Sequence, residues 1–316
     1  MTTPAVQLAG LTRSFGDTTV LRGLDLTVPR GEIFALLGPN GAGKTTCVRI
    51  LATLLDADGG SAQVAGYDVR TQRSEVRSRI SLTGQYAAVD ELQTGAENLR
   101  MIARFAHLGR RAAAERTAEL LNRFDLEGAA DRRVSTYSGG MRRRLDLAAS
   151  LVRRPEVLFL DEPTTGLDPR SRAGMWDVVT DLARSGTTVF LTTQYLEEAD
   201  RLADRIAVLD GGRIVASGTA VELKRTLGRQ RLELTAADDT AWRQLTGVLG
   251  GAVVTSERAE RRIVLPVDGD ARGVRELLDN LDPDRTRIEH FAVGGASLDD
   301  VFLALTGSVH TEVTHV

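Results

Sequence analysis

A glycine-rich stretch near the N-terminus has the residue types and the spacing of a phosphate-binding loop, or P-loop. It follows the apolar run Ile33–Leu37 and reads Gly38, Pro39, Asn40, Gly41, Ala42, Gly43, Lys44, Thr45 and Thr46. Glycines let the backbone turn tightly so that successive N–H groups point inward, and the dipole of a following helix adds positive potential there. Lys44 can reach the outer phosphates of a nucleotide, and the Thr45 hydroxyl can coordinate the accompanying Mg²⁺. The alternative is a turn without a ligand, but the predicted strand before the loop and helix after it favour nucleotide binding.

A second apolar run ends in two carboxylates. Val157–Leu160 is followed by Asp161 and Glu162, and a buried parallel strand would deliver both at its carboxyl end, where open α/β sheets bind ligands. Asp161 can hold Mg²⁺ through water, and Glu162 can orient or deprotonate the water that attacks a γ-phosphate. A strand followed by a polar turn is the alternative, but a P-loop in the same chain favours a hydrolase site.

A further stretch has features of an anion-binding site and of an ordinary helix start. Tyr137, Ser138, Gly139, Gly140 and Met141 precede a predicted helix at 142–152, whose dipole and free N–H groups favour phosphate. Ser-Gly-Gly is also a common N-cap sequence, so the stretch alone leaves both interpretations open. The arginines at 142–144 invite a nucleic-acid interpretation, but no aromatic residues interleave with them, and a charge run on a helix is usually a solvated face.

The elements that must position these motifs have the order of an α/β domain followed by a smaller domain. Strands are predicted at 6–11, 18–28, 33–37, 62–65, 80–83, 157–160 and 187–193, helices at 95–107, 112–124, 142–152 and 196–202, and a hairpin around Gly211–Gly212. From residue 231 the predicted order is strand 232–234, helix 240–249, strand 252–255, strand 262–267, helix 271–281 and strand 287–293, which is that of a ferredoxin-like βαββαβ domain. The predicted fold class is α/β: a P-loop NTPase core with an N-terminal antiparallel β subdomain and a helical subdomain, plus a small α+β C-terminal domain. We expect domains at 1–228, with the helical subdomain at about 86–155, and at 229–307, before a disordered tail at 308–316.

Composition sets the broad class. The chain has 316 residues, 42% hydrophobic and 26% charged, with a net charge of −3, which is ordinary for a globular protein and gives no general attraction to nucleic acid. No run approaches the ~20 apolar residues that span a bilayer, and the first residues lack a signal-peptide pattern, so we expect a cytoplasmic chain. The single cysteine, Cys47, fits a reducing compartment. Because it follows the P-loop, a bulky thiol reagent should weaken nucleotide binding, provided that the thiol is reachable.

These motifs, in this order, resemble the ATP-binding subunit of an ABC transporter over roughly residues 5–228. The resemblance implies ATP and Mg²⁺ as ligands, Lys44 and Glu162 in catalysis, and Asp161 at the metal. It also implies that Phe15 stacks on adenine, and that Gln85 touches Mg²⁺ and senses the membrane subunit. Ser138, Gly139 and Gly140 then resemble the signature that closes on the nucleotide of an opposite subunit, and Asp168 a loop aspartate that crosses the dimer interface.

Two motifs depart from the family pattern. The signature reads Tyr-Ser-Gly-Gly-Met where the family commonly has Leu-Ser-Gly-Gly-Gln, and Gln194 follows the predicted strand 187–193 where the family usually has a histidine. The amide of Gln194 can donate to a γ-phosphate, but it cannot titrate near about pH 6.5 as imidazole does. We therefore expect ATP hydrolysis that is slower than in histidine-bearing relatives and that lacks a histidine-type pH step.

Within that family, Gln194, the segment 83–91 and the segment 298–307 resemble the daunorubicin-type drug-resistance exporters. That resemblance implies a homodimer joined through ATP and export of a hydrophobic compound such as an antibiotic. It also implies a separate membrane-spanning permease that attaches the chain to the inner face of the cell membrane. The C-terminal domain is then a dimer-stabilising or regulatory appendage, and no direct contact with nucleic acid is expected.

Two other functions stay open. A soluble ABC ATPase would act on ribosomes or DNA without a permease, although such relatives commonly carry two ATPase units or a coiled-coil or zinc-bearing insertion, and this chain has one P-loop and one cysteine. A binding module would instead use ATP as a switch with little turnover, which the missing histidine permits.

Overall fold

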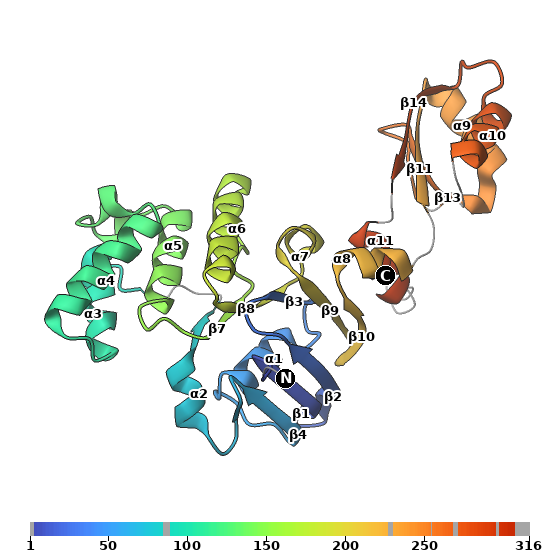
Figure 1. Ribbon diagram of the computed structural model, residues 1–316. Helices are drawn as coiled ribbons and strands as arrows, with labels where there is room; N and C mark the ends of the chain where they lie inside the picture. The colour runs from blue at the N-terminus through green and yellow to red at the C-terminus, as the bar shows by residue number, and fades with distance from the viewer. Residues whose placement is uncertain are drawn as a thin grey trace. The chain divides into compact units, whose positions relative to one another are not determined.

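The structure, a computed structural model, describes residues 3–84, 89–226, 230–253, 255–267, 271–294 and 297–306. The chain divides into two compact units, Met1–Ala220 and Val221–Val316 (Figure 1). Each unit has its own hydrophobic core.

A six-stranded sheet in the order β10-β9-β3-β8-β7-β6 forms the centre of the first unit. The strands are β3 (Ile33–Leu37), β6 (Ile80–Thr83), β7 (Val157–Asp161), β8 (Thr188–Thr193), β9 (Arg205–Asp210) and β10 (Arg213–Gly218). Neighbouring strands from β9 to β6 run parallel, whereas β10 returns antiparallel to β9. All residues of β3, β7 and β8 are buried, which explains their mostly apolar sequences. Because these strands are parallel neighbours, their carboxyl ends lie at one edge of the sheet.

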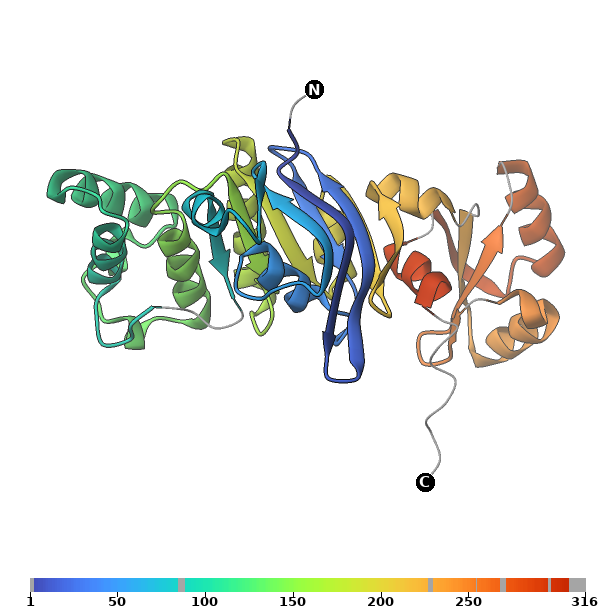
Figure 2. The same ribbon diagram turned by 90° about the horizontal axis from the view of Figure 1, so that it is seen from below.

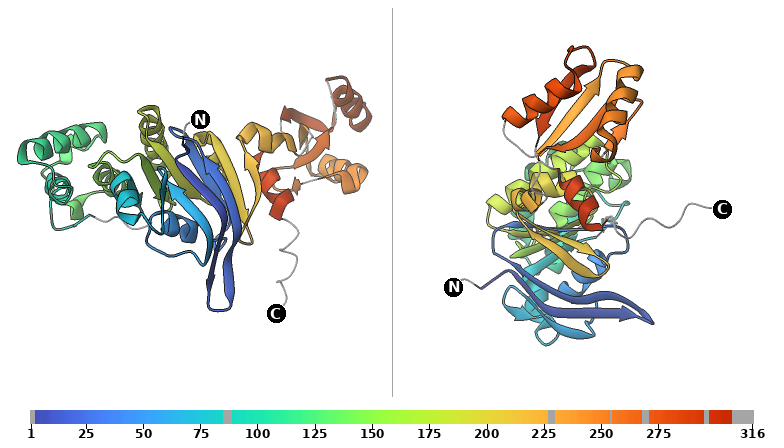
Figure 3. Two further views of the ribbon diagram at one scale, coloured as in Figure 1. Left: turned by 60° about the horizontal axis from the view of Figure 1, so that its bottom comes forward. Right: turned by 90° about the vertical axis from the view of Figure 1, so that its right-hand side faces the viewer.

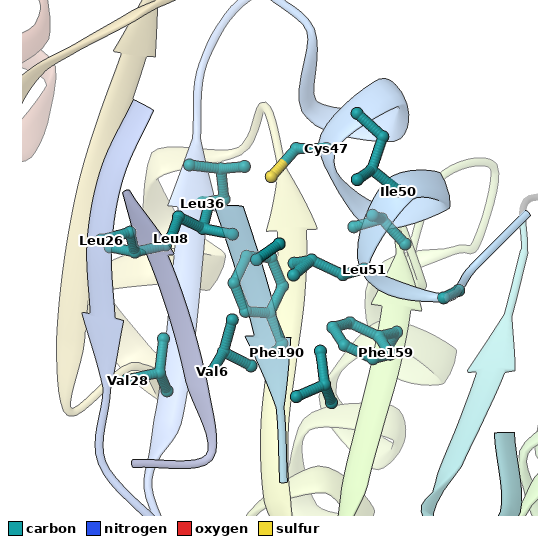
Figure 4. Packing of buried hydrophobic residues seen from close by; sticks show 14 of the residues in the cluster. Val6, Leu8, Leu26, Val28, Leu36, Cys47, Ile50, Leu51, Phe159 and Phe190 are labelled. Carbon is teal, nitrogen blue, oxygen red and sulfur yellow. The ribbon is translucent and has the colours of Figure 1, made fainter. Parts of the chain in front are cut away.

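The N-terminal part of this unit also forms an antiparallel sheet in the order β2-β1-β4-β5. Its strands are β1 (Val6–Phe15), β2 (Thr18–Val28), β4 (Gly59–Val64) and β5 (Tyr67–Asp68). Its buried side chains share one core with helix α1 (Lys44–Leu51) and the central sheet. Figure 4 shows Leu8 and Leu26 of this sheet, Leu51 of α1 and the rings of Phe159 and Phe190 in that core. The centroids of these two rings are 5.6 Å apart. The helix that follows the P-loop, α1, therefore packs on a closely packed apolar core.

A group of helices lies at one end of this unit, on the left in Figures 1 and 2. It comprises α3 (Gly95–Phe105), α4 (Arg110–Arg123), α5 (Gly139–Ser150) and the short 3-10 helices η1 (Glu127–Ala129) and η2 (Val134–Thr136). The buried Tyr137 hydroxyl donates to the Ala129 carbonyl oxygen at 2.6 Å. A Cβ at Gly95 would lie 2.3 Å from that hydroxyl oxygen. The absence of a side chain at Gly95 therefore makes room for Tyr137.

Three further helices complete the first unit: α2 (Arg73–Arg79), α6 (Pro169–Arg184) and α7 (Leu196–Leu202). Asp168 caps α6 by accepting a hydrogen bond from the Ser171 N–H, and Pro169 occupies the first turn, where its missing N–H costs nothing. Among the described residues of the whole chain, no helix has the length and apolar character needed to cross a bilayer.

The second unit contains a four-stranded sheet in the order β12-β13-β11-β14, and all neighbours in it are antiparallel. Its elements are α8 (Ala220–Thr226), β11 (Gln230–Ala236), α9 (Asp239–Leu249), η3 (Gly250–Ala252), β12 (Thr255–Glu257), β13 (Arg262–Val267), α10 (Ala271–Leu281), β14 (Ile288–Gly294) and α11 (Leu298–Thr306). Leu232 and Leu234 alternate with more exposed residues along β11 and share a core with Leu245 of α9 and Val274 of α10. This is the strand order of the ferredoxin-like fold.

The structure confirms the predicted α/β fold class with its ferredoxin-like element order, and it differs at several boundaries. Strand pairing extends β1 to Phe15, and the Ser138 cap starts α5 at Gly139 instead of residue 142. Helix α2 was not predicted from the sequence, and the strand expected at 252–255 is displaced to β12. The predicted boundary at 228 and the tail at 308–316 lie outside the described residues, so those domain limits stay a prediction.

Candidate functional site

The P-loop connects β3 to α1, and two of its glycines are required by close approaches. A Cβ at Gly38 would lie 2.3 Å from the Leu209 carbonyl oxygen, and a Cβ at Gly43 would lie 2.7 Å from Cδ2 of Leu21. Gly43 also has φ 108°, which L side chains rarely adopt. The loop backbone is therefore fixed by its neighbours in β2 and β9.

Lys44 lies inside the loop and is almost fully buried, with 4% of its surface exposed. Its ammonium donates to the carbonyl oxygens of Gly38 and Pro39 at 2.8 and 3.0 Å. The same Nζ lies 3.4 Å from Oε1 of Glu162. Two backbone carbonyls thus hold the charge inside the loop, where it can reach a bound phosphate chain.

Three oxygen-bearing side chains converge beside the loop. Thr45 Oγ1 donates to Asp161 Oδ1 at 3.1 Å, and Thr192 Oγ1 donates to the same oxygen at 2.6 Å. They come from α1, β7 and β8, and the register that pairs Asp161 with Thr192 brings the last two together. Thr192 was not predicted from the sequence, although two hydroxyl residues that end an apolar strand are a usable signal.

The donor set around Asp161 suits a hard cation. Mg²⁺ prefers oxygen ligands and is commonly held by one or two carboxylates together with substrate phosphates. Within the described part of the chain, no three His, Cys, Asp or Glu side chains group closely enough to hold a metal ion by themselves. A single carboxylate with the Thr45 hydroxyl therefore fits Mg²⁺ that arrives with a nucleotide.

Glu162 occupies a strained turn directly after β7. Its backbone has φ 50°, in the left-handed region that non-glycine residues seldom adopt. Its N–H donates to the Thr192 carbonyl oxygen at 3.1 Å and to Thr192 Oγ1 at 3.2 Å. This turn aims the carboxylate at Lys44, as the 3.4 Å separation records.

Gln194 follows β8 next to the first residue of the P-loop. The register pairs Leu37 with Thr193, and the Gly38 N–H donates to the Thr193 carbonyl oxygen at 3.2 Å. The side chain of Gln194 is half-buried. The structure therefore brings Gln194, Lys44, Thr45, Asp161 and Glu162 to one edge of the sheet.

The Ser138 motif and the Asp168 loop form a second group. Ser138 Oγ accepts from the Met141 N–H at 3.2 Å, and a Cβ at Gly140 would lie 2.6 Å from Ser171 Oγ. That Ser171 hydroxyl donates to Asp168 at 2.6 Å, and the bonds from Ser171 lower the pKa of Asp168. Within the described part of the chain, no hydrogen bond joins residues 138–140 to the P-loop.

Phe15 stands at the end of β1, in a hairpin that reaches beyond the rest of its sheet (Figure 3, left). Its side chain is 47% exposed, and the Arg13 guanidinium lies 4.8 Å from its ring centroid. The same hairpin approaches the P-loop, because a Cβ at Gly43 would lie 2.7 Å from Leu21 and 3.1 Å from Val20. Gln85, the remaining predicted site residue, lies outside the described residues.

The expectation of a solvated face at 142–144 is wrong for Arg143. Arg142 and Arg144 pair with Glu91 and Asp125 near the surface, but the helix turns Arg143 inward, where it is 7% exposed. Burial lowers the pKa of its guanidinium. Periodicity predicts which face of a helix is buried, but it gave no reason to place a cation there.

Two more buried groups belong to elements of the first unit that carry site residues or adjoin them. Glu198 of α7 accepts hydrogen bonds from the Thr164 hydroxyl at 2.9 Å and the Trp176 ring N–H at 3.1 Å, and burial raises its pKa. The sequence did not single it out.

Cys47 is fully buried, and burial raises the pKa of its thiol to about 12. The predicted sensitivity of nucleotide binding to a thiol reagent required a reachable thiol, and the structure does not meet that condition.

Comparison with known proteins agrees with this geometry. Residues 21–165 match the family described as ABC transporter, and residues 218–306 match the C-terminal domain of DrrA1-3-like ATP-binding proteins. The chain is 50% identical to the daunorubicin/doxorubicin resistance ATP-binding protein DrrA of Streptomyces peucetius, over 96% of this chain and 93% of that protein. The chain belongs to the DrrA-type ATP-binding proteins of the ABC transporter family.

More distant members of the ABC transporter family match over similar lengths. A doxorubicin resistance ATP-binding protein DrrA of Mycobacterium tuberculosis is 45% identical over 99% of this chain and 96% of that protein. A Nod factor export ATP-binding protein I of Ralstonia nicotianae is 38% identical over 96% and 94%. The solved structure of an ATP-binding subunit of an ABC transporter superposes with a TM-score of 0.64 at 27% identity, covering 71% of this chain and 93% of that one. ATP binding and ATP hydrolysis, as predicted, are therefore confirmed at the level of the family.

Proposed function

We propose that this chain is the ATP-hydrolysing subunit of an exporter for drugs or similar compounds and that it works with a separate membrane-spanning permease. The printed names of its relatives, which concern daunorubicin resistance and Nod factor export, support an exporter. The observation that carries the chemistry is the meeting of Lys44 with Glu162 at 3.4 Å beside the Thr45 to Asp161 contact at 3.1 Å. The permease would attach the chain to the inner face of the cell membrane.

The P-loop would hold the phosphates of ATP. Backbone N–H groups of residues 38–46 and the N-terminus of α1 would surround the phosphate chain. Lys44, which donates to two loop carbonyls, would direct its charge to the outer phosphates. Phe15, with about half of its surface exposed, would stack on the adenine.

Thr45 and Asp161 would hold Mg²⁺, Asp161 through water, and Gln85 would complete the site. When bound, the ion neutralises negative charge on the β- and γ-phosphates. Thr192 fixes the orientation of the Asp161 carboxylate through its bond at 2.6 Å. Such second contacts preserve the geometry of a metal ligand.

Glu162 would orient or deprotonate the attacking water. Thr192 on the neighbouring strand holds the backbone of its turn, and its carboxylate lies 3.4 Å from the Lys44 ammonium. A fixed base close to the reacting phosphate is what general base catalysis requires. Gln194, beside Gly38, would donate its amide to the γ-phosphate.

A second copy of the chain would complete each site. Ser138, Gly139, Gly140 and Asp168 form one group at the N-termini of α5 and α6, and within the described residues this group makes no hydrogen bond to its own P-loop. Free N–H groups at a helix N-terminus favour phosphate. We therefore infer a homodimer in which this group closes on the nucleotide of the opposite copy.

The other functions have less support. The relatives that match nearly the full length of the chain are named as resistance or export proteins, which does not favour a ribosome or DNA ATPase. An ATP switch with little turnover is distinguished by the rate of steady-state phosphate release.

The test of this proposal is Glu162→Gln. The amide cannot accept a proton, so we expect turnover to fall by about 10²–10⁴-fold, while the Kd for ATP stays within about twofold because the P-loop is unchanged. A closed dimer should accumulate with ATP and be visible by size-exclusion chromatography.

The matched control is Glu115→Gln, an exposed carboxylate on α4 that pairs with Arg111. It should leave turnover and ATP binding unchanged. A Glu162→Gln chain with normal phosphate release would refute the assigned base, and a parent chain that binds no ATP would refute the proposed site as a whole.

A further inference from the structure

Arg143 joins three parts of the first unit through one buried guanidinium. Its Nε donates to the Pro163 carbonyl oxygen at 2.8 Å, and its Nη1 donates to the Gly84 carbonyl oxygen at 2.6 Å. The side chain starts from α5, whose N-cap is Ser138. The guanidinium therefore links α5 to the chain that follows β7 and to the chain that follows β6.

Both acceptors stand next to site residues. Pro163 directly follows Glu162, and Gly84 directly precedes Gln85. The Glu162 turn is thus held from two sides. Thr192 accepts from the Glu162 N–H, and Arg143 donates to the Pro163 carbonyl oxygen. A shift of α5 would pull on both segments at once.

Stability alone does not explain a cation in this place. The carboxylate paired with Arg143, Asp146 Oδ2, lies 3.5 Å from Nη1, and Nη2 has no hydrogen-bond partner among the described residues. A buried ion pair of this quality is often no more stabilising than apolar side chains of similar size. The planar fork of arginine, however, presents donors on separate nitrogens in fixed directions toward two carbonyls, whereas the donors of lysine all rotate about one nitrogen and an apolar residue has none.

We propose that Arg143 is a positioning residue that couples the N-terminus of α5 to the Glu162 turn and to Gly84, directly after β6. A phosphate of the opposite copy's nucleotide that binds at the Ser138 end of α5 then also aligns Glu162, the base in this copy's own site. The inference rests on the proposed function, because it takes Glu162 as the base.

The test compares Arg143→Lys and Arg143→Gln with Arg144→Gln, the matched control on the same helix, which donates to Phe124 and Asp125. Lysine keeps the buried charge beside Asp146 but loses the fork, so it separates positioning from charge. We expect both Arg143 variants of the full chain to lose turnover by roughly tenfold to a hundredfold, as misplacement of a reacting group does, with KM for ATP within about threefold. Normal turnover in Arg143→Lys would overturn the proposal.

A double-mutant cycle identifies the route. If Arg143 acts through Glu162, then Arg143→Lys should change the residual turnover of Glu162→Gln by less than about twofold. An equal loss in both backgrounds means that Arg143 acts elsewhere, and it overturns the inference while leaving the role of Glu162 intact. Normal turnover in Glu162→Gln alone would instead refute the proposed base.

Hydrogen exchange tests the link without turnover. In Arg143→Gln, amides of residues 81–84 and 162–165 should exchange faster together, while those of β9 stay unchanged. The Arg144→Gln chain should match the parent. Unchanged exchange in either segment of Arg143→Gln would overturn the proposed coupling.

Discussion

Single residues in this site take their roles from their neighbours. Asp161 is one carboxylate after an apolar strand, but Thr45 and Thr192 converge on one of its oxygens and fix its direction. Glu162 is held in a left-handed turn that the same Thr192 supports. Gln194 lies beside Gly38 because β3 and β8 are paired in register. Each role can therefore be tested at one position.

Gln194→His should introduce a pH step. Imidazole titrates near about pH 6.5 and its cation interacts with phosphate more strongly than an amide does, so we expect severalfold faster hydrolysis and a new inflection in the pH–rate profile. Steady-state phosphate release between about pH 5.5 and 8.5 measures both. Gln63→His on the exposed part of β4 is the control. An unchanged rate and profile in Gln194→His would count against the role of Gln194.

Cys47 should resist alkylation in the native chain. The thiol is fully buried with its pKa raised to about 12, so at about pH 8 nearly all of it is the unreactive protonated form. Mass spectrometry should find no adduct over hours with a bulky maleimide, and one adduct per chain in denaturant. ATP affinity should be unchanged by the reagent, and rapid labelling of the native chain would contradict the burial.

At the scale of elements, the Tyr-Ser-Gly-Gly-Met signature is supported by its own packing. Tyr137 is buried, donates to Ala129 at 2.6 Å and fills the space beside Gly95. This leaves Ser138 free to cap α5. The departure from leucine at this position is therefore matched by a glycine at the start of α3.

Gly95→Ala should destabilise the chain by about 1–3 kcal/mol, because the new Cβ would overlap the Tyr137 hydroxyl. Tyr137→Leu removes that hydroxyl, so the double variant should lose less stability than the sum of the two single variants. Thermal or urea unfolding measures the difference. Gly174→Ala in α6, where a Cβ meets nothing within 4 Å, is the control, and strict additivity would contradict the contact.

At the scale of the whole molecule, the ATP site and the C-terminal fold belong to different compact units. Unit Met1–Ala220 contains every described site residue, and unit Val221–Val316 contains the ferredoxin-like sheet with its own core. An independent core allows the second unit to serve dimerisation or regulation without supplying a residue to the chemistry.

A chain ended at about residue 228 should bind ATP normally and dimerise more weakly. The ATP-trapped dimer of Glu162→Gln provides the assay, with sedimentation velocity for the dimer and nucleotide titration for the Kd. A chain ended at residue 306, which keeps the described part of the second unit, is the control. Equal dimerisation of both chains would show that the second unit does not contribute to dimerisation.

The sequence by itself determined the local features of this protein. The P-loop, the Asp161–Glu162 pair and the Ser138 motif are contiguous, and their spacing alone identifies the backbone shapes they need. The βαββαβ order of the second unit follows from hydrophobic periodicity for the same reason. The predicted start of α5 was wrong, because the side-chain cap of Ser138 decides where that helix begins.

Only the tertiary structure decided which distant residues meet. Thr192 reaches Asp161 because two parallel strands pair in one register, and no local pattern fixes that register. Arg143 looks like a surface arginine in a charged run, but packing of α5 against the chain after β6 and β7 buries it on two carbonyls. Burial and long-range contact depend on how separated segments pack, and for that reason these residues were visible only in the folded chain.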